Sequence, residues 1–181
     1  MIKEQTTYRL TFSPAQDPLK GVFIVIVHAT RIPPHIGMVI AGNYHSLSVK
    51  GQNINVPVNT LLKNSALRKI PTVFVKIKPH LTFSEDYLNE HFITNVRQFK
   101  RVDKGVATCL SPLKLFFEEV YSLHLNDVNY LYELLPLLDS VGLIESTTSC
   151  HLDEVTYKLP IYTNKEINEG IDQVRKDFKD Q

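Results

Sequence analysis

The first part of the chain alternates short apolar runs with turn-forming residues, which is typical of an antiparallel sheet. Residues 8–13 alternate apolar and polar positions and predict a strand. Residues 21–28 form a β-branched apolar run, and we expect a central strand there. Residues 35–41 predict a second apolar strand, and residues 44–49 predict the strand that returns beside it. Gly42-Asn43 between them is a tight hairpin signal, so these two strands are expected to be antiparallel neighbours.

Two capped helices are expected in the middle of the chain. Asn59 is the expected N-cap of a short helix that ends at Arg68. Thr82 or Ser84 is the expected N-cap of a second helix that runs to about Phe99. The remaining expected elements are a loop at 51–55, a strand at 72–78, leucine-rich helices at 112–123 and 127–141, and a broken strand at 155–162. Together these elements indicate an α+β fold, with an antiparallel sheet packed against helices.

The last residues predict an amphipathic helix over 165–181. Thr163 and Glu166 have the spacing of a capping box, which satisfies free N–H groups at a helix start. Apolar residues then recur at helical spacing at Ile167, Ile171, Val174 and Phe178. Such a stripe packs either on its own domain or on a protein partner, and we favour its own domain.

Composition narrows the functional classes. The chain has 181 residues, of which 20 are basic and 19 acidic, so its formal charge is +1. This balance argues against a nucleic-acid partner bound through bulk charge. There is no apolar run long enough to predict a transmembrane helix. The first residues lack the apolar segment of a signal peptide, so we expect a cytoplasmic location and reduced cysteines.

Cys109, His35 and His45 are the residues with the clearest chemical potential. Cys109 lies at the expected start of the helix at 112–123, where free N–H groups and the helix dipole favour a thiolate. A histidine beside such a sulfur can act as base and then as acid, while a third polar group orients the imidazole. In the simplest hairpin register, His45 shares a face with Ile40, whereas His35 points to the opposite face.

The stretch PPHIGMVIAGNYHSL, residues 33–47, resembles the histidine hairpin of permuted papain-like proteins. These are circularly permuted relatives of NlpC-type peptidases and include the lecithin–retinol acyltransferase group. The Gly-led apolar strand at 21–27 and the motif His35-Ile36-Gly37 match that pattern. Thr108-Cys109-Leu110, followed by a helix to Leu123, resembles the family's cysteine element. The resemblance implies a circularly permuted papain-like core over residues 1–125, with residues 126–181 completing the same domain.

The resemblance also implies roles for three residues. Cys109 is the expected nucleophile toward an amide, ester or thioester carbonyl, His35 the general base and acid, and His45 the residue that orients His35. The N–H of Cys109 and a neighbouring donor would hold the oxyanion. No cofactor is implied, and the substrate class remains open between a small molecule, a peptide and a lipid-like acyl group.

Two further interpretations remain open at this point. The chain is alternatively a non-catalytic binding or assembly module in which Cys109 is unreactive. A zinc site built from His28, His35, His45 and Cys109 is disfavoured, because no two of them have a short ligand spacing. A basic cluster precedes the cysteine element and is either a solvated surface or an attraction for an anionic substrate group; it comprises Arg97, Lys100, Arg101 and Lys104.

Overall fold

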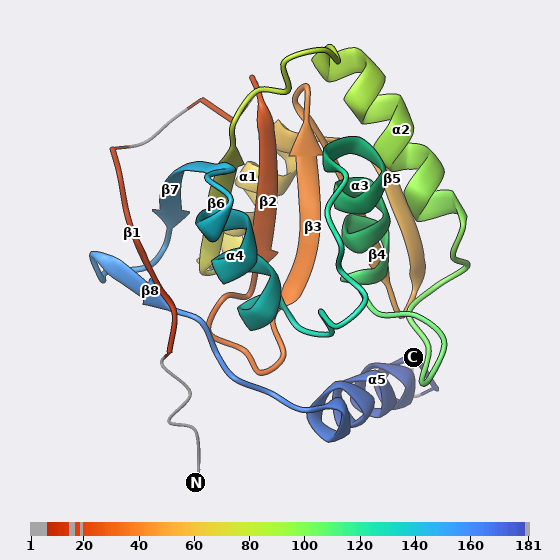
Figure 1. The fold of residues 1–181 in the computed structure, drawn as a ribbon. Helices are drawn as coiled ribbons and strands as arrows, with labels where there is room; N and C mark the ends of the chain where they lie inside the picture. The colour runs from red at the N-terminus through yellow and green to blue at the C-terminus, as the bar shows by residue number, and fades with distance from the viewer. Residues whose placement is uncertain (1–6, 15–16, 19, 180–181) are drawn as a thin grey trace, which may run out of the picture.

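A six-stranded antiparallel sheet forms the centre of the molecule (Figure 1). The structure is a computed structural model that describes residues 7–14, 17–18 and 20–179. The strand order is β5-β4-β3-β2-β6-β7. These strands are β2 (Val22–Val27), β3 (His35–Ile40), β4 (Asn43–Ser48), β5 (Gly51–Pro57), β6 (Thr72–Ile77) and β7 (Ile144–Cys150). A separate ribbon pairs β1 (Arg9–Thr11) with β8 (Thr156–Lys158), and the α+β prediction is confirmed.

Helices cover both faces of the sheet, and the strand β2 shows why. Its side chains are all buried, with Ile24 and Ile26 on one face and Phe23 and Val25 on the other. The first face packs against α2 (Glu85–Arg97), α3 (Ser111–Tyr121) and α4 (Leu131–Ser140), and the second against α1 (Val58–Arg68). Each fully buried side chain of this size stabilises the fold by about 1.5–3 kcal/mol, so a strand apolar on both faces belongs at the sheet centre.

The hairpin between β3 and β4 keeps the predicted faces but changes the predicted partners. Ile40 pairs with Asn43 and Met38 with His45, so the turn residues are Ala41 and Gly42. Both turn residues have positive φ, as a two-residue turn matching the sheet twist requires. The pairing differs from the predicted one by two residues, and a slip of two leaves every side chain on its predicted face.

Two helix starts, those of α1 and α4, differ from the predictions, and the N-cap of α2 is one of the two predicted residues. α1 begins directly after Pro57, so Asn59 lies inside the helix rather than capping it. Ser84 caps α2 by accepting the N–H of Tyr87 at 3.3 Å. α4 begins later than expected, because the Glu133 side chain accepts N–H groups of the preceding residues and holds them outside the helix.

Two strands were not predicted. β5 falls on the expected loop at 51–55 and is the edge strand beside β4. β7 is polar and pairs antiparallel with β6 at the opposite edge. Its residues belong to the 126–181 segment, so that segment adds a strand to the sheet formed by the earlier residues. The expected broken strand at 155–162 is present only as β8.

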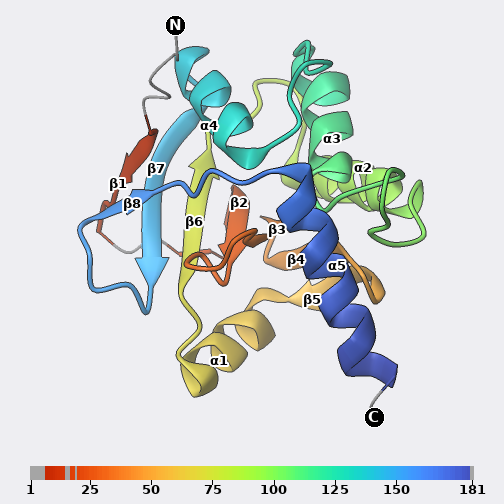
Figure 2. The ribbon, with the colours of Figure 1, turned by 90° about the horizontal axis from the view of Figure 1, so that it is seen from below.

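The expected C-terminal helix is α5 (Asn164–Lys179), which lies beneath the sheet in Figure 1. Glu166 accepts the N–H and hydroxyl of Thr163, so the predicted capping box is confirmed. Ile171 packs with Leu47, Val102 and Ala107, and Figure 2 shows α5 running past the strands β3 to β5. Helices within the described ranges lack the combination of length and apolar character needed to cross a membrane.

Candidate active site

Cys109 lies beside the first residues of β3, and local hydrogen bonds place it there. Val102 donates its N–H to the carbonyl of Ser48, which ties the segment before α3 to the end of β4. Thr108 then forms a tight turn, in which its N–H reaches Ser111 Oγ at 3.0 Å and its Oγ1 accepts the N–H of Leu110 at 3.2 Å. The helix begins at Ser111, so Cys109 precedes it by two residues. The half-buried Cys109 sulfur accepts the N–H of Ile36, the residue that follows His35.

His35 opens β3 and is held by a polar pair on the neighbouring strands. Its Nε2 lies 3.1 Å from Ser46 Oγ on β4. Asn53 on β5 donates from Nδ2 to the same oxygen at 3.0 Å. Ser46 therefore engages Nε2 of His35 and leaves the other ring nitrogen, Nδ1, outside this contact.

Burial disfavours the charged forms of both Cys109 and His35. It lowers the pKa of His35 to about 4, and the nearby His28 adds to this shift. Burial also raises the pKa of the Cys109 thiol, and the N–H groups of Ile36, Cys109 and Leu110 only partly oppose that rise. The resting site is therefore a neutral thiol and a neutral imidazole rather than a thiolate–imidazolium pair.

A cavity of about 860 Å³ joins Cys109 and His35. His28 also lines it, from the end of β2, where its φ is 54°. The turn at residues 31–34 forms one wall, and Tyr162 with one side of α5 forms another. The cavity has the size of a small-molecule site, so the two residues of the predicted pair share a space that a substrate group can enter.

His45 does not lie with Cys109 and His35, so the prediction that it orients His35 is wrong. Its side chain is fully buried on the other face of the sheet, as the pairing of β3 with β4 requires. Its Nε2 lies 2.8 Å from Asn89 Oδ1 on α2, and its Nδ1 accepts the N–H of Asn55 at 3.0 Å. The register between β4 and β5 shifts at this residue, so His45 stabilises a bulge and the packing of α2. Ser46, and not His45, contacts the ring of His35.

Tyr44 makes a close contact next to Ser46 that the sequence did not reveal. Its ring covers Gly37, where an added Cβ would lie 2.6 Å from the ring and from the His45 carbonyl oxygen. Burial raises the pKa of Tyr44; a hydrogen bond with Ser46 opposes the shift and the nearby Cys109 adds to it. A glycine inside a strand often marks such a close approach, and Gly37 was the available signal.

The other candidate residues have different environments. Arg101 and Lys104 of the basic cluster form ion pairs with Asp103 and Asp172. Cys150 lies on β7 and packs beside the apolar cluster under α1. Among the described side chains, no group of three or more His, Cys, Asp or Glu residues is arranged to hold a metal ion.

Compared with protein-family models, curated proteins and solved structures, the chain matches none of them.

Proposed function

We propose that this protein is a cysteine-dependent hydrolase or acyltransferase that acts on an amide, ester or thioester carbonyl. One observation carries the proposal: Cys109 and His35 line one cavity, and the far nitrogen of His35 is held by Ser46. Nucleophile, base and orienting group are the three parts that such chemistry needs. Along the chain they follow the order His, polar residue, Cys, as in the permuted papain-like proteins that the sequence resembles.

The neutral pair suits a concerted first step. With its Nε2–H donated to Ser46, His35 takes the thiol proton on Nδ1 as the Cys109 sulfur forms a bond to the carbonyl carbon. The backbone N–H groups of Ile36, Cys109 and Leu110 favour negative charge on the sulfur as its proton leaves. His35 then gives the proton to the leaving group, which leaves a thioester on Cys109. Water completes hydrolysis, and a second acceptor completes acyl transfer.

A non-catalytic binding module is the second candidate, and the raised pKa of the Cys109 thiol favours it. Such a thiol is mostly protonated near neutral pH and is a weak nucleophile unless His35 removes its proton. The two candidates therefore differ in whether Cys109 becomes acylated in a His35-dependent manner.

The decisive experiment is acyl-adduct formation. The protein would be incubated near pH 7.5 with p-nitrophenyl acetate and with a medium-chain acyl thioester, and the adduct on Cys109 measured by mass spectrometry. We expect an adduct in the wild type and in the control Cys150→Ser. Cys109→Ser should form none, and His35→Gln should slow it by about 10²-fold or more. Equal labelling of both cysteines, or labelling unchanged in His35→Gln, would establish the non-catalytic alternative.

A further inference from the structure

We propose that α5 is a gate over the Cys109 cavity, held closed by an ion-pair clamp. The inference rests on the proposed function for its purpose, but its geometry is independent of it. Two separate observations support it: one side of α5 lines the cavity, and the other contacts of α5 include paired charges on the segment that precedes Cys109.

One side of α5 covers the cavity, with a mostly apolar surface to which Gln173 and Asp177 also contribute. Ile167, Ile171 and Val174 line it together with Gly170. Gly170 faces Pro33 across the cavity wall, where an added Cβ would make ordinary van der Waals contact at 3.7 Å. Displacement of α5 would therefore remove one wall and expose Cys109 to larger molecules.

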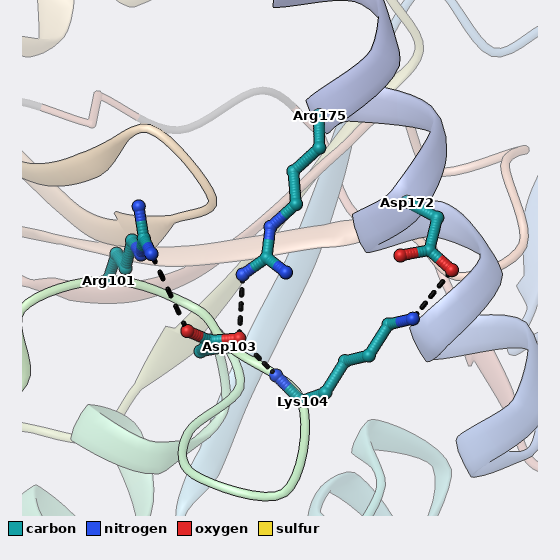
Figure 3. A network of polar contacts seen from close by, with 5 residues as sticks. All are labelled: Arg101, Asp103, Lys104, Asp172 and Arg175. Atoms are coloured by element: carbon teal, nitrogen blue, oxygen red, sulfur yellow. Dashed lines mark hydrogen bonds and ion pairs between the residues drawn. The ribbon is translucent and has the colours of Figure 1, made fainter.

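The clamp joins α5 to residues 101–104 (Figure 3). Arg175 Nη2 lies 2.6 Å from Asp103 Oδ1, and Lys104 Nζ lies 2.6 Å from Asp172 Oδ2. Arg101 adds a longer contact of 3.7 Å to the other oxygen of Asp103. All five side chains are partly exposed, so salt can screen these pairs and weaken the clamp.

The chain before α5 is fixed, which defines the hinge. The Tyr162 hydroxyl accepts the N–H of Leu131 at 3.3 Å, and its carbonyl accepts the Tyr132 hydroxyl at 3.1 Å. Both bonds hold Tyr162 against the start of α4. Movement of α5 would thus begin at Thr163, the capping residue, and leave the rest of the fold in place.

Access to Cys109 tests the gate without requiring catalysis. Alkylation would be followed at both cysteines by mass spectrometry, with iodoacetamide as the small reagent and a polyethylene-glycol maleimide as the large one. In Asp172→Asn/Arg175→Gln we expect the large reagent to modify Cys109 about fivefold faster than in the wild type. Raising the salt from low to high should accelerate the wild type and leave the double variant unchanged. Cys150 is the internal reference, and its rate should stay constant.

A matched control removes a charge from the same helix. Lys165 and Glu169 form an exposed pair within α5 that does not reach the 101–104 segment. Glu169→Ala should therefore leave the Cys109 rates unchanged. The gate is overturned if the double variant matches the wild type at every salt concentration, or if Glu169→Ala has the same effect. The pH dependence of Cys109 alkylation by iodoacetamide should be the same in the double variant and in the wild type. A change in modification by the large reagent without a change in that pH dependence reports the gate and not the chemistry of the thiol.

Discussion

His35 and Ser46 lie on adjacent strands, two residues out of direct pairing, and their side chains meet at 3.1 Å. Diagonal neighbours on one face of an antiparallel pair are within reach of long side chains, and an imidazole is long enough. This contact engages Nε2 of His35 and not its other ring nitrogen, Nδ1.

Replacing Ser46 by alanine should slow acylation of Cys109 by about 10-fold to 100-fold, because His35 loses the group that orients its ring. The rate would be measured with the acyl thioester, and the imidazole tautomer by ¹⁵N NMR. Ser65→Ala is the matched control, since Ser65 is a buried serine bonded to Thr72 at 2.9 Å outside the site. Equal rates and an unchanged tautomer in Ser46→Ala would remove Ser46 from the site.

The low pKa of His35 predicts a loss of stability in acid. His35 is neutral in the folded protein down to about pH 4, whereas in the unfolded chain it gains a proton near its ordinary pKa of 6.5. Its contribution is therefore complete above pH 6.5 and declines as the pH falls toward 4, by about 3 kcal/mol in all. Urea unfolding at several pH values should show a shallower decline in His35→Gln. His28 and His45, whose pKa values are also lowered, remain in both proteins. Parallel pH curves would contradict the assignment.

Gly37→Ala should destabilise the protein by about 1–3 kcal/mol, because the new methyl group would meet a backbone carbonyl and the Tyr44 ring at 2.6 Å. Gly170→Ala provides a contrast of opposite sign. Gly170 lies within α5, and its added Cβ has room, so helix propensity should raise stability by up to about 1 kcal/mol. Thermal unfolding of both variants checks the pair of predictions. A stable Gly37→Ala would mean that the contact over Gly37 is loose.

His45→Gln separates the structural role of His45 from a catalytic one. The glutamine cannot satisfy Asn89 and the Asn55 N–H with the same geometry, so the free energy of unfolding should fall by about 1–3 kcal/mol. At a temperature where the variant is folded, Cys109 acylation should stay within about twofold of the wild type. A loss comparable to that of His35→Gln would restore His45 to the site.

The sequence predicted the strands whose side chains are apolar because they are buried. The strands β2, β3 and β6 are apolar because both faces are buried, and their runs were recognised. β5 was missed because it is a mostly exposed edge strand whose polar residues look like a loop. β7 was missed for a similar reason, since its Ser and Thr residues carry no apolar alternation. Backbone pairing holds these two edges, and pairing is not visible in composition.

The site was predicted as far as residue type and face permit. Cys109 and His35 were identified as a pair, and the structure places both on one cavity. The contact between His35 and Ser46 was missed, because the expected register was two residues away and would have set the two side chains far apart. Register depends on the turn, and the observed turn uses Ala41, a residue with no strong turn preference, at positive φ.

The ribbon of β1 and β8 has a consequence for how the chain is made. Leu10 pairs with Tyr157, so β1 cannot pair until residues 156–158 have been synthesised. Contacts so distant along the chain close late, after local helices and hairpins have formed. α5 emerges from the ribosome later still. A nascent chain from which α5 has not yet emerged therefore lacks one wall of the cavity that Cys109 lines.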